Sequence, residues 1–303
     1  KKVQGLTYGI SGNVMRSRSS SVFIWNDIEE GLYRPKTGTV TRTQGAQYYL
    51  DPQVNYRTSK GTRHTLRGRF HRQEFDNDND QSNSNTTIYG EYQLQQELDL
   101  LGPTMITAGV VVRNTDSEAL LYGGDEDGNG RNTSSNLAGY LQVDKKLLER
   151  IALSLGMRYE QFTVNDESAS EPVFRAGATW QVFEATYLRA SYGQGFRFPT
   201  IGERYIRTAV GLLNIYPNPD LRAEQSWNVE AGLKQGFKIG RFMGYVDAVV
   251  FRQDFQDYVE FTFGQWVPSQ GTANLFGLGF KSVNTGGARV TGYEFEAVGI
   301  GAV

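Results

Sequence analysis

Alternation of apolar and polar residues with a period of two is the dominant pattern along the chain. Between residues 227 and 234, one face carries Trp, Val, Ala and Leu, whereas the other carries Asn, Glu, Gly and Lys. Residues 46–57, 88–98 and 151–160 alternate in the same way. A helix would scatter these apolar residues around its axis, whereas a strand places each set on one side. The pattern therefore predicts β-strands.

Two kinds of connection separate the alternating segments, and they follow one another in turn. The short ones are 58–61, 99–103, 144–150, 181–184 and 238–241. The long polar ones are 27–44, 76–85, 116–135, 164–172, 197–223 and 264–281. This order is typical of an antiparallel up-and-down transmembrane β-barrel, with short periplasmic turns and long extracellular loops. We predict an all-β fold with roughly twelve strands, each long enough to cross a bilayer.

A large soluble antiparallel protein is the alternative, because one face of its sheet would also pack on a core. Strand length argues against it, since soluble strands have a mode of about five to six residues. Aromatic residues also gather near the predicted strand ends, for example Trp180, Phe183, Phe237 and Phe242. Aromatic girdles at both interfaces are typical of a membrane barrel.

Composition narrows the function classes. The 303 residues include 31 Lys+Arg and 33 Asp+Glu, a formal net charge of −2, which argues against a nucleic-acid partner. Cysteine is absent and only two histidines occur, which leaves no disulfide framework and no thiolate metal site. The longest apolar stretches, such as 105–112, are far shorter than the ~18 residues of a membrane-spanning helix. No nucleophile-base constellation is present, so we do not expect an enzyme.

Four short segments in the second half of the chain have distinctive patterns. They are Phe-Arg-x-Pro with Phe196, Arg197 and Pro199; Asn-Pro-x-Leu-x-x-Glu with Asn218, Pro219 and Glu224; Trp-x-x-Glu-x-Gly-Leu-Lys with Glu230 and Gly232; and Asn-x-Gly followed by Gly-x-Glu with Asn284, Gly292 and Glu294. In this order, over residues 188–296, the chain resembles the TonB-dependent outer-membrane receptors.

The resemblance implies a barrel of about 22 strands filled by an N-terminal plug domain. Residues 1–303 would then be the middle of one barrel domain, with the plug, the TonB box and the closing strands outside this chain. The implied function is import of a scarce ligand across the outer membrane, with a ferric siderophore or similar chelate ahead of cobalamin or a glycan. Energy would come from the TonB–ExbB–ExbD complex acting on the plug.

Three other functions stay open at this point. A passive porin would share the strands but have an open lumen, and a plug upstream would argue against it. A non-transporting structural or adhesin barrel of the envelope would differ only in its partners. An outer-membrane enzyme is the fourth reading. Outer-membrane lipid and lipopolysaccharide are expected partners of every such barrel, and a small-molecule ligand is expected of the receptor.

The first two motifs also have a physical interpretation of their own. Pro199 lacks an N–H and would end a strand. Arg197 would hold the loop by pairing with a carboxylate such as Glu203 or Glu224, or else would face the vestibule and meet an anionic ligand. Glu230 and Lys234 share one face of a strand and need partners on neighbouring strands.

The ligand-binding candidates are loop residues. Aromatic rings would stack on planar or sugar surfaces of a ligand, and arginines would meet anionic groups of a ferric chelate. The candidates are Arg204, Arg207, Tyr205, Tyr216, Trp266 and Tyr122, with Phe263 and Phe276 as further aromatics. The alternative for each is that the loops simply pack on one another.

One loop has the first half of a calcium-binding pattern. Asp125, Asp127 and Asn129 occupy positions 1, 3 and 5 of an EF-hand-type loop and are followed by Gly130. Position 12 is Asn136 rather than a bidentate glutamate, which argues against a full EF-hand. A calcium ion in residues 125–136 is one interpretation, and a solvated turn is the other. We expect no other cofactor.

Overall fold

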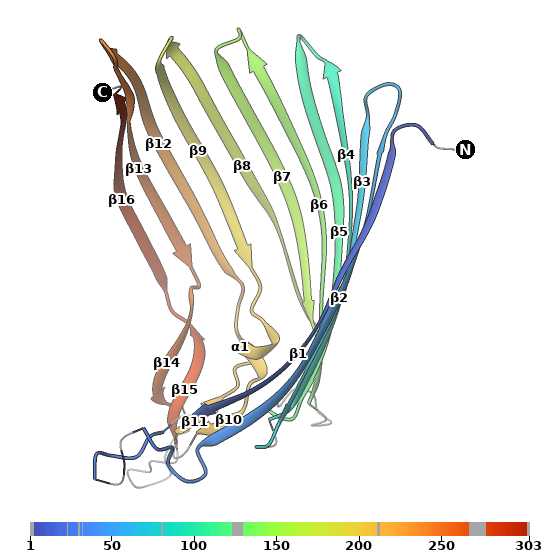
Figure 1. The fold of residues 1–303 in the computed structure, drawn as a ribbon, viewed down its shortest axis with the longest axis vertical. Coiled ribbons are helices and arrows are strands. Elements are labelled where there is room, and N and C mark those ends of the chain that lie inside the picture. Colours follow the sequence, from blue (N-terminus) through green and yellow to red (C-terminus); the bar gives the residue numbers. More distant parts are fainter. Residues whose placement is uncertain are drawn as a thin grey trace.

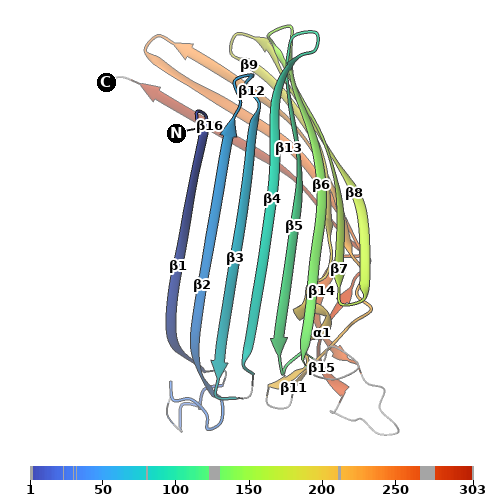
Figure 2. The same ribbon diagram turned by 90° about the vertical axis from the view of Figure 1, so that its right-hand side faces the viewer.

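The computed structural model describes residues 3–22, 24–29, 31, 33–79, 81–122, 130–210, 213–266 and 277–301. Twelve strands form one antiparallel sheet that curves into part of a barrel, with β1 and β16 at its two edges (Figures 1 and 2). In sheet order they are β1 (Leu6–Val22), β2 (Val40–Arg57), β3 (Arg63–Asn77), β4 (Asn83–Asp99), β5 (Pro103–Ala119), β6 (Arg131–Leu147), β7 (Ile151–Val164), β8 (Glu167–Phe183), β9 (Thr186–Arg197), β12 (Glu224–Ile239), β13 (Phe242–Gln256) and β16 (Gly287–Gly301). The predicted all-β fold is confirmed.

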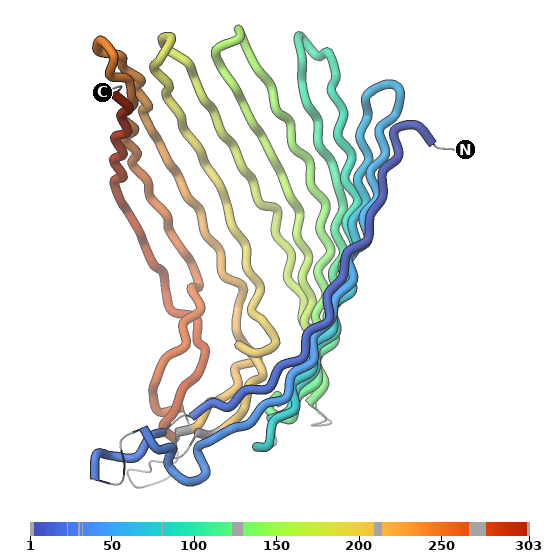
Figure 3. Tube along the Cα trace, viewed as in Figure 1, coloured from blue at the N-terminus to red at the C-terminus, as the bar shows by residue number. Residues whose placement is uncertain are grey.

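The strands of this sheet are 12 to 18 residues long. Crossing a bilayer at a tilt takes about 9–11 residues, so every strand is long enough. Short turns join the strands at one end, where both ends of the described chain also lie (Figure 3). They confirm the five predicted short connections, although β6 continues to Leu147, into the segment expected to be a turn.

The two faces of the sheet differ in polarity. One face carries exposed apolar side chains, and the register aligns them across strands, as for Tyr92 of β4 opposite Val110 of β5. The other face carries ion pairs, such as Arg69 with Asp51 at 2.6 Å. An apolar band outside and a polar interior are typical of a membrane barrel. We therefore call these the outer and the inner face.

A second, smaller sheet and a helix lie at the end opposite the short turns (Figure 1). This loop sheet has the order β10 (Thr208–Val210), β11 (Leu213–Tyr216), β15 (Leu278–Asn284), β14 (Val259–Gln265). The helix α1 (Ile201–Tyr205) has five residues. Among the described residues, no helix has the length and apolarity needed to span a membrane.

The prediction of a long loop at 164–172 is wrong. Strand β7 ends at Val164 and β8 begins at Glu167, so the connection is the turn at Asn165, whose φ is 52°. Pro172 lies within β8, although a proline cannot donate a hydrogen bond to a ladder. It is tolerated within β8 because β8 pairs with β9 only from Arg175 onward, which leaves Pro172 without a neighbour on that side.

Three of the other long connections are shorter or more ordered than predicted. Strand β3 ends at Asn77 and β4 begins at Asn83, inside the segment 76–85 that was expected to be a loop. The segments 197–223 and 264–281 were expected to be irregular, yet they contribute α1 and most of the loop sheet.

Candidate functional site

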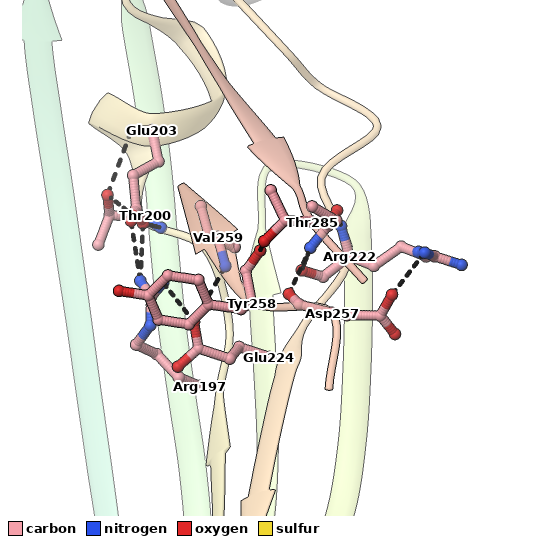
Figure 4. Close-up of polar contacts among 10 residues, drawn as sticks. Arg197, Thr200, Glu203, Arg222, Glu224, Asp257, Tyr258, Val259 and Thr285 are labelled. Atoms are coloured by element: carbon pink, nitrogen blue, oxygen red, sulfur yellow. Dashed lines mark hydrogen bonds and ion pairs between the residues drawn. The ribbon is translucent and has the colours of Figure 1, made fainter. Parts of the chain in front are cut away.

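A single guanidinium connects three elements at the loop end of the sheet. Arg197, the last residue of β9, places Nη1 2.9 Å from Oε1 and 3.0 Å from Oε2 of Glu203 in α1, and Nη2 3.2 Å from Oε2 of Glu224 in β12 (Figure 4). Glu224 Oε2 also accepts a hydrogen bond from the N–H of Val259, at 3.1 Å. Both predicted ion pairs of Arg197 are therefore present. Contact of Arg197 with an anionic ligand stays a prediction.

Helix α1 begins at a capping box directly after Pro199. The N–H of Glu203 donates to Thr200 Oγ1 at 3.2 Å, and the N–H of Thr200 donates to Glu203 Oε2 at 2.8 Å. Burial alone would raise the pKa of the Glu203 carboxyl, but the hydrogen bonds from Thr200 and Arg197 outweigh it and hold this pKa below its ordinary value. Glu203 is therefore ionised at neutral pH. The Thr-x-x-Glu spacing was a signal for this helix that the sequence interpretation did not use.

The second and fourth motifs meet at the same place. Asn218 Nδ2 donates to the carbonyl of Ser282 at 2.8 Å. Asn284 Oδ1 accepts from the N–H of Arg222 at 2.8 Å, and its Nδ2 donates to the carbonyls of Arg222 and Asp257 at 3.1 and 2.7 Å. These side-chain amides hold loop backbone that would otherwise lack partners. Three of the four motifs thus fix the loops to the strand ends.

Arg204 is fully buried. Its Nη2 donates to Glu167 Oε2 at 2.7 Å and to the carbonyl of Pro219, and its guanidinium lies 5.4 Å from the ring centre of Phe198 and 5.6 Å from that of Tyr205. Its Nε and Nη1 are buried with no hydrogen-bond partner in the described part of the chain. In this arrangement Arg204 holds α1 against β8. Its ligand-binding role stays a prediction that requires the side chain to become accessible.

Three more ligand candidates lie in or beside α1. Tyr205 is buried in a small cluster with Val164 and Ile201, against which Tyr122 also packs. Burial raises the pKa of Tyr122. Arg207 is exposed just beyond the helix, and its N–H donates to the carbonyl of Leu121 at 2.6 Å. Of these candidates, Arg207 is the one whose side chain solvent reaches freely.

Tyr216 and Trp266 both lie beside Gly279 in the loop sheet. Trp266 Nε1 donates to the carbonyl of Gly279 at 3.0 Å, and Tyr216 Cε2 would lie 3.0 Å from a Cβ atom at residue 279. Lys281 Nζ lies 5.8 Å from the centre of the Trp266 ring. The structure thus brings together two predicted ligand residues and adds a cation, Lys281, that sequence reasoning missed because its strand is too short to show a period.

Aromatic rings cover the other face of the loop sheet. Phe261 and Phe263 of β14 lie 5.2 and 5.3 Å, between ring centres, from Phe280 of β15. Phe261 is 53% exposed and Phe263 is 50% exposed. Phe276, also predicted from the sequence, lies outside the described residues.

The third motif and the end of the fourth line the inner wall of the barrel. Glu230 lies 3.5 Å from Arg189 Nε, and Lys234 Nζ lies 3.7 Å from the ring centre of Tyr245, so both have the partners on neighbouring strands that were predicted. A Cβ atom at Gly292 would lie 2.4 Å from the ring of Phe251, so this glycine makes room for an aromatic side chain. Glu294 is exposed on β16.

The calcium prediction cannot be placed, because Asp125, Asp127 and Asn129 lie outside the described residues. Asn136 belongs to β6, where its Nδ2 donates to Glu160 Oε2 at 2.8 Å. Within the described ranges, no group of three or more His, Asp or Glu side chains is positioned to hold a metal ion.

Comparisons with known proteins agree with this architecture. A sequence model described as "TonB dependent receptor-like, beta-barrel" matches residues 5–301. The siderophore receptor PirA from Pseudomonas aeruginosa superimposes with a TM-score of 0.67 at 14% identity, covering 97% of this chain and 57% of that one. A double mutant of the Serratia marcescens hemophore receptor HasR, in complex with HasA and heme, gives 0.68 at 12% identity, covering 97% and 50%.

Curated relatives match a shorter stretch. A hemoglobin and hemoglobin-haptoglobin-binding protein of Haemophilus ducreyi is 27% identical over 152 residues, which are 49% of this chain and 14% of the relative. Hemoglobin-haptoglobin utilization protein B of Neisseria meningitidis serogroup A is 29% identical over 134 residues, which are 41% and 16%. The chain thus matches only a small part of these relatives and about half of the solved structures.

Proposed function

Because the chain belongs to the family of TonB-dependent receptor β-barrels, we propose that it is part of the barrel wall of a receptor that actively imports a scarce ligand. Family membership also assigns it to the outer membrane, as predicted. The family consists of receptors and transporters rather than enzymes.

The observation that carries the proposal is the ordered structure at the loop end of the large sheet. It consists of α1 and the loop sheet, and we call it the cap. Arg197 joins β9, α1 and β12, and Asn284 joins the second loop to the first. A fixed cap favours high-affinity binding, because little conformational entropy remains to be lost when a ligand docks. A passive porin has no need of such a site. Tyr216, Trp266 and Lys281 supply rings and a cation, which suit a planar, anionic ligand.

We propose a ferric chelate as the ligand. A ferric siderophore carries aromatic or carboxylate groups that would stack on Trp266 and Tyr216 and pair with Arg207. Haem is the second candidate: it is planar and carries two propionates, and the names of the curated relatives refer to hemoglobin. The proposed energy source is the TonB–ExbB–ExbD complex, acting on a plug domain encoded outside this chain.

The test uses the full-length receptor in a strain that has no other iron receptor. Growth on a ferric siderophore or on haem as sole iron source, lost when TonB is deleted, would support the proposal. Growth that persists without TonB would support the passive porin, and no dependence on the receptor would support a structural or adhesin barrel. Opening of a closed pore by mild urea in a planar bilayer would show that a removable plug fills the lumen.

The binding residues are tested separately. Arg207→Ala, Tyr216→Ala and Trp266→Ala are each expected to weaken ligand binding by about tenfold, since one aromatic or charged contact contributes about 1–2 kcal/mol. Tyr187→Ala, near the short turns at the other end of β9, is the control. Unchanged binding in all three variants would overturn the assignment of these residues but leave import intact.

A further inference from the structure

Strands β8 and β9 separate before they reach the loop end. They pair only from Arg175 and Gly193 toward the short turns. Beyond that point, β8 pairs only with β7, and β9 pairs only with β12. Residues 167–174 of β8 and 194–197 of β9 therefore have no ladder between them, and we call this gap the seam. No backbone hydrogen bond joins the two segments, both of which lie within the described ranges.

The local sequence explains why the ladder stops there. The N–H of Phe174 donates to the side chain of Gln194, to Oε1 at 3.0 Å, instead of to a backbone carbonyl. Because backbone groups alternate in direction along a strand, the next N–H toward β9 would belong to Pro172, which has none. On the other side, Gly193 and Gly195 flank Gln194, which makes β9 easy to bend where it leaves β8.

The seam begins at the edge of the apolar band and runs away from the membrane. Tyr159 of β7 and Phe174 of β8 are the last large apolar residues on the outer face of these strands, and they are 49 and 45% exposed. Beyond them this face carries Gln161, Ser168 and Ser170. An opening at the seam would therefore join the barrel interior to water rather than to lipid.

Phe198 and α1 cover the seam, and we call them the lid. Phe162 of β7 lies 6.0 Å from Phe196 and 6.3 Å from Phe198, between ring centres. Helix α1 adds Tyr205, which packs against Val164 of β7. These are contacts between apolar side chains, so they can separate without breaking a backbone hydrogen bond.

The lid is held unequally on its two sides. Toward β9 and β12, Arg197 forms ion pairs with both Glu203 in the lid and Glu224. Toward β8, the charged link is that of Arg204 with Glu167, whose side chain is 61% exposed. Water stabilises an exposed carboxylate almost as well outside an ion pair as within it, so this link is the weaker one. Separation should therefore begin at β8, with the lid remaining attached to β9.

A backbone link just beyond the lid leads to another loop. The N–H of Arg207 donates to the carbonyl of Leu121 at 2.6 Å. This bond joins two loops and does not involve β8. It therefore does not resist separation of the lid from β8.

The closed seam also leaves part of Arg204 unsatisfied. The side chain is fully buried, yet its Nε and Nη1 have no hydrogen-bond partner in the described part of the chain. Water would satisfy both donors once the lid moves away from β8, so opening recovers part of their desolvation cost. The closed arrangement is thus only moderately favoured over an open one.

We propose that the seam opens and closes, and that the lid regulates this side entrance to the mouth of the barrel. The ion pair of Arg204 with Glu167 is its latch. When the latch releases, the lid moves away from β8 together with the end of β9, and water and small polar solutes enter from the side. The proposal is independent of what the receptor imports.

Single cysteines in a full-length receptor that has no other cysteine report the opening, and residues 1–303 contain none to remove. Val164→Cys places the reporter under the lid, and Ala138→Cys places it on the inner face of β6; both residues are 2% exposed. The probe is a small, charged methanethiosulfonate reagent, and its reaction rate in nanodiscs is followed by intact-protein mass spectrometry.

Each reporter is combined with one of two substitutions in β8. Glu167→Gln releases the latch and leaves Arg204 buried without its carboxylate. Glu171→Gln is the matched control, because it removes the same charge from the same face of β8, where Glu171 forms no ion pair within the described ranges. Heat-modifiable migration in gels verifies that each variant is folded.

We expect Val164→Cys to react at least about tenfold faster than Ala138→Cys, because local opening exposes only the first. Glu167→Gln should raise the rate at Val164→Cys by a further factor of about ten, typical of losing a hydrogen bond to a charged group, whereas Glu171→Gln should change it by less than about twofold. Equal rates at the two reporters would overturn the proposal, as would equal effects of the two glutamine substitutions. Equal acceleration of both reporters by Glu167→Gln would show loosening of the whole barrel and would also overturn it.

Discussion

The guanidinium of Arg189 lies over Gly232, where a Cβ atom would stand 2.9 Å from Arg189 Nε. Arg189 of β9 and Gly232 of β12 are paired in the register of the sheet. Because Gly232 has no side chain, Arg189 can extend across β12 and place its Nη1 2.8 Å from Oδ2 of Asp247 on β13. The other oxygen of this carboxylate, Oδ1, is buried and has no hydrogen-bond partner among the described residues, so Asp247 depends on Arg189. The glycine of the third motif is thus explained by the arginine that passes over it.

Replacing Gly232 with valine should break this ion pair. The valine side chain would displace Arg189, and a carboxylate that is only 13% exposed would lose its main donor. The expected loss is about 2 kcal/mol of unfolding free energy, typical of a hydrogen bond to a charged group. It is measured from the urea unfolding midpoint of the full receptor in lipid vesicles. Gly177→Val is the control, since nothing lies within 4 Å of a Cβ atom there. Equal effects of the two substitutions would contradict the explanation.

Removal of the Arg197 side chain should release the loop that follows β9. Arg197→Ala would leave both Glu203 and Glu224 without their shared partner, and residues 198–223 should become sensitive to protease. We expect a loss of about 2 kcal/mol, because these groups are partly buried. Arg222→Ala is the matched control at the same junction. Arg222 pairs with Asp257 but is 70% exposed, so we expect less than about 1 kcal/mol. Comparable protease sensitivity in both variants would argue against a special role for Arg197.

The contacts of the Glu203 carboxylate with Thr200 and Arg197, which stabilise α1, should be lost only at acid pH. The pKa of Glu203 is lowered from 4.5, so its contribution to stability is fully present above that value and disappears as pH falls through the lower, folded-state pKa. Hydrogen exchange of residues 200–206, corrected for the intrinsic pH dependence of amide exchange, should therefore be constant from pH 8 to about pH 5 and rise below about pH 4. Glu203→Gln should remove this step. A rise centred between pH 6 and 7 would show that another group controls the helix.

The large sheet could be predicted from the sequence because its signal is long and repeated. Alternation over eight to twelve residues recurs in several segments, as in residues 46–57 of β2, and the short turns mark the strand ends. The loop sheet carried no such signal. Strands β10 and β11 have three and four residues, and β11 pairs in parallel with β15, which lies far away in the sequence. Pairing of that kind depends on tertiary contacts rather than on local pattern.

The same distinction applies to the site residues. The ion pairs of Arg197 were predicted because Arg197 lies where Pro199 ends the strand, and two glutamates, Glu203 and Glu224, lie in the loop that follows. The burial of Arg204 was not, because its partners come from the start of β8 and from the Asn-Pro turn. Nothing in the sequence around Arg204 separates an arginine that faces a ligand from one enclosed by Phe198 and Tyr205.

Two substitutions of Arg204 should separate packing from charge. Arg204→Ala would leave a cavity between Phe198 and Tyr205 and remove the link to Glu167, so hydrogen exchange of residues 200–206 should rise by at least tenfold. Arg204→Met keeps most of the volume and removes two donors that are buried without partners, so its exchange should stay within a few-fold of the parent. Ligand binding is measured on the same samples. If Arg204→Met keeps the helix protected but loses ligand binding, Arg204 reaches the ligand after all, and the closed arrangement around it must open when the ligand docks. If it keeps both, Arg204 serves the loop alone and ligand contact falls to Arg207 and the loop sheet.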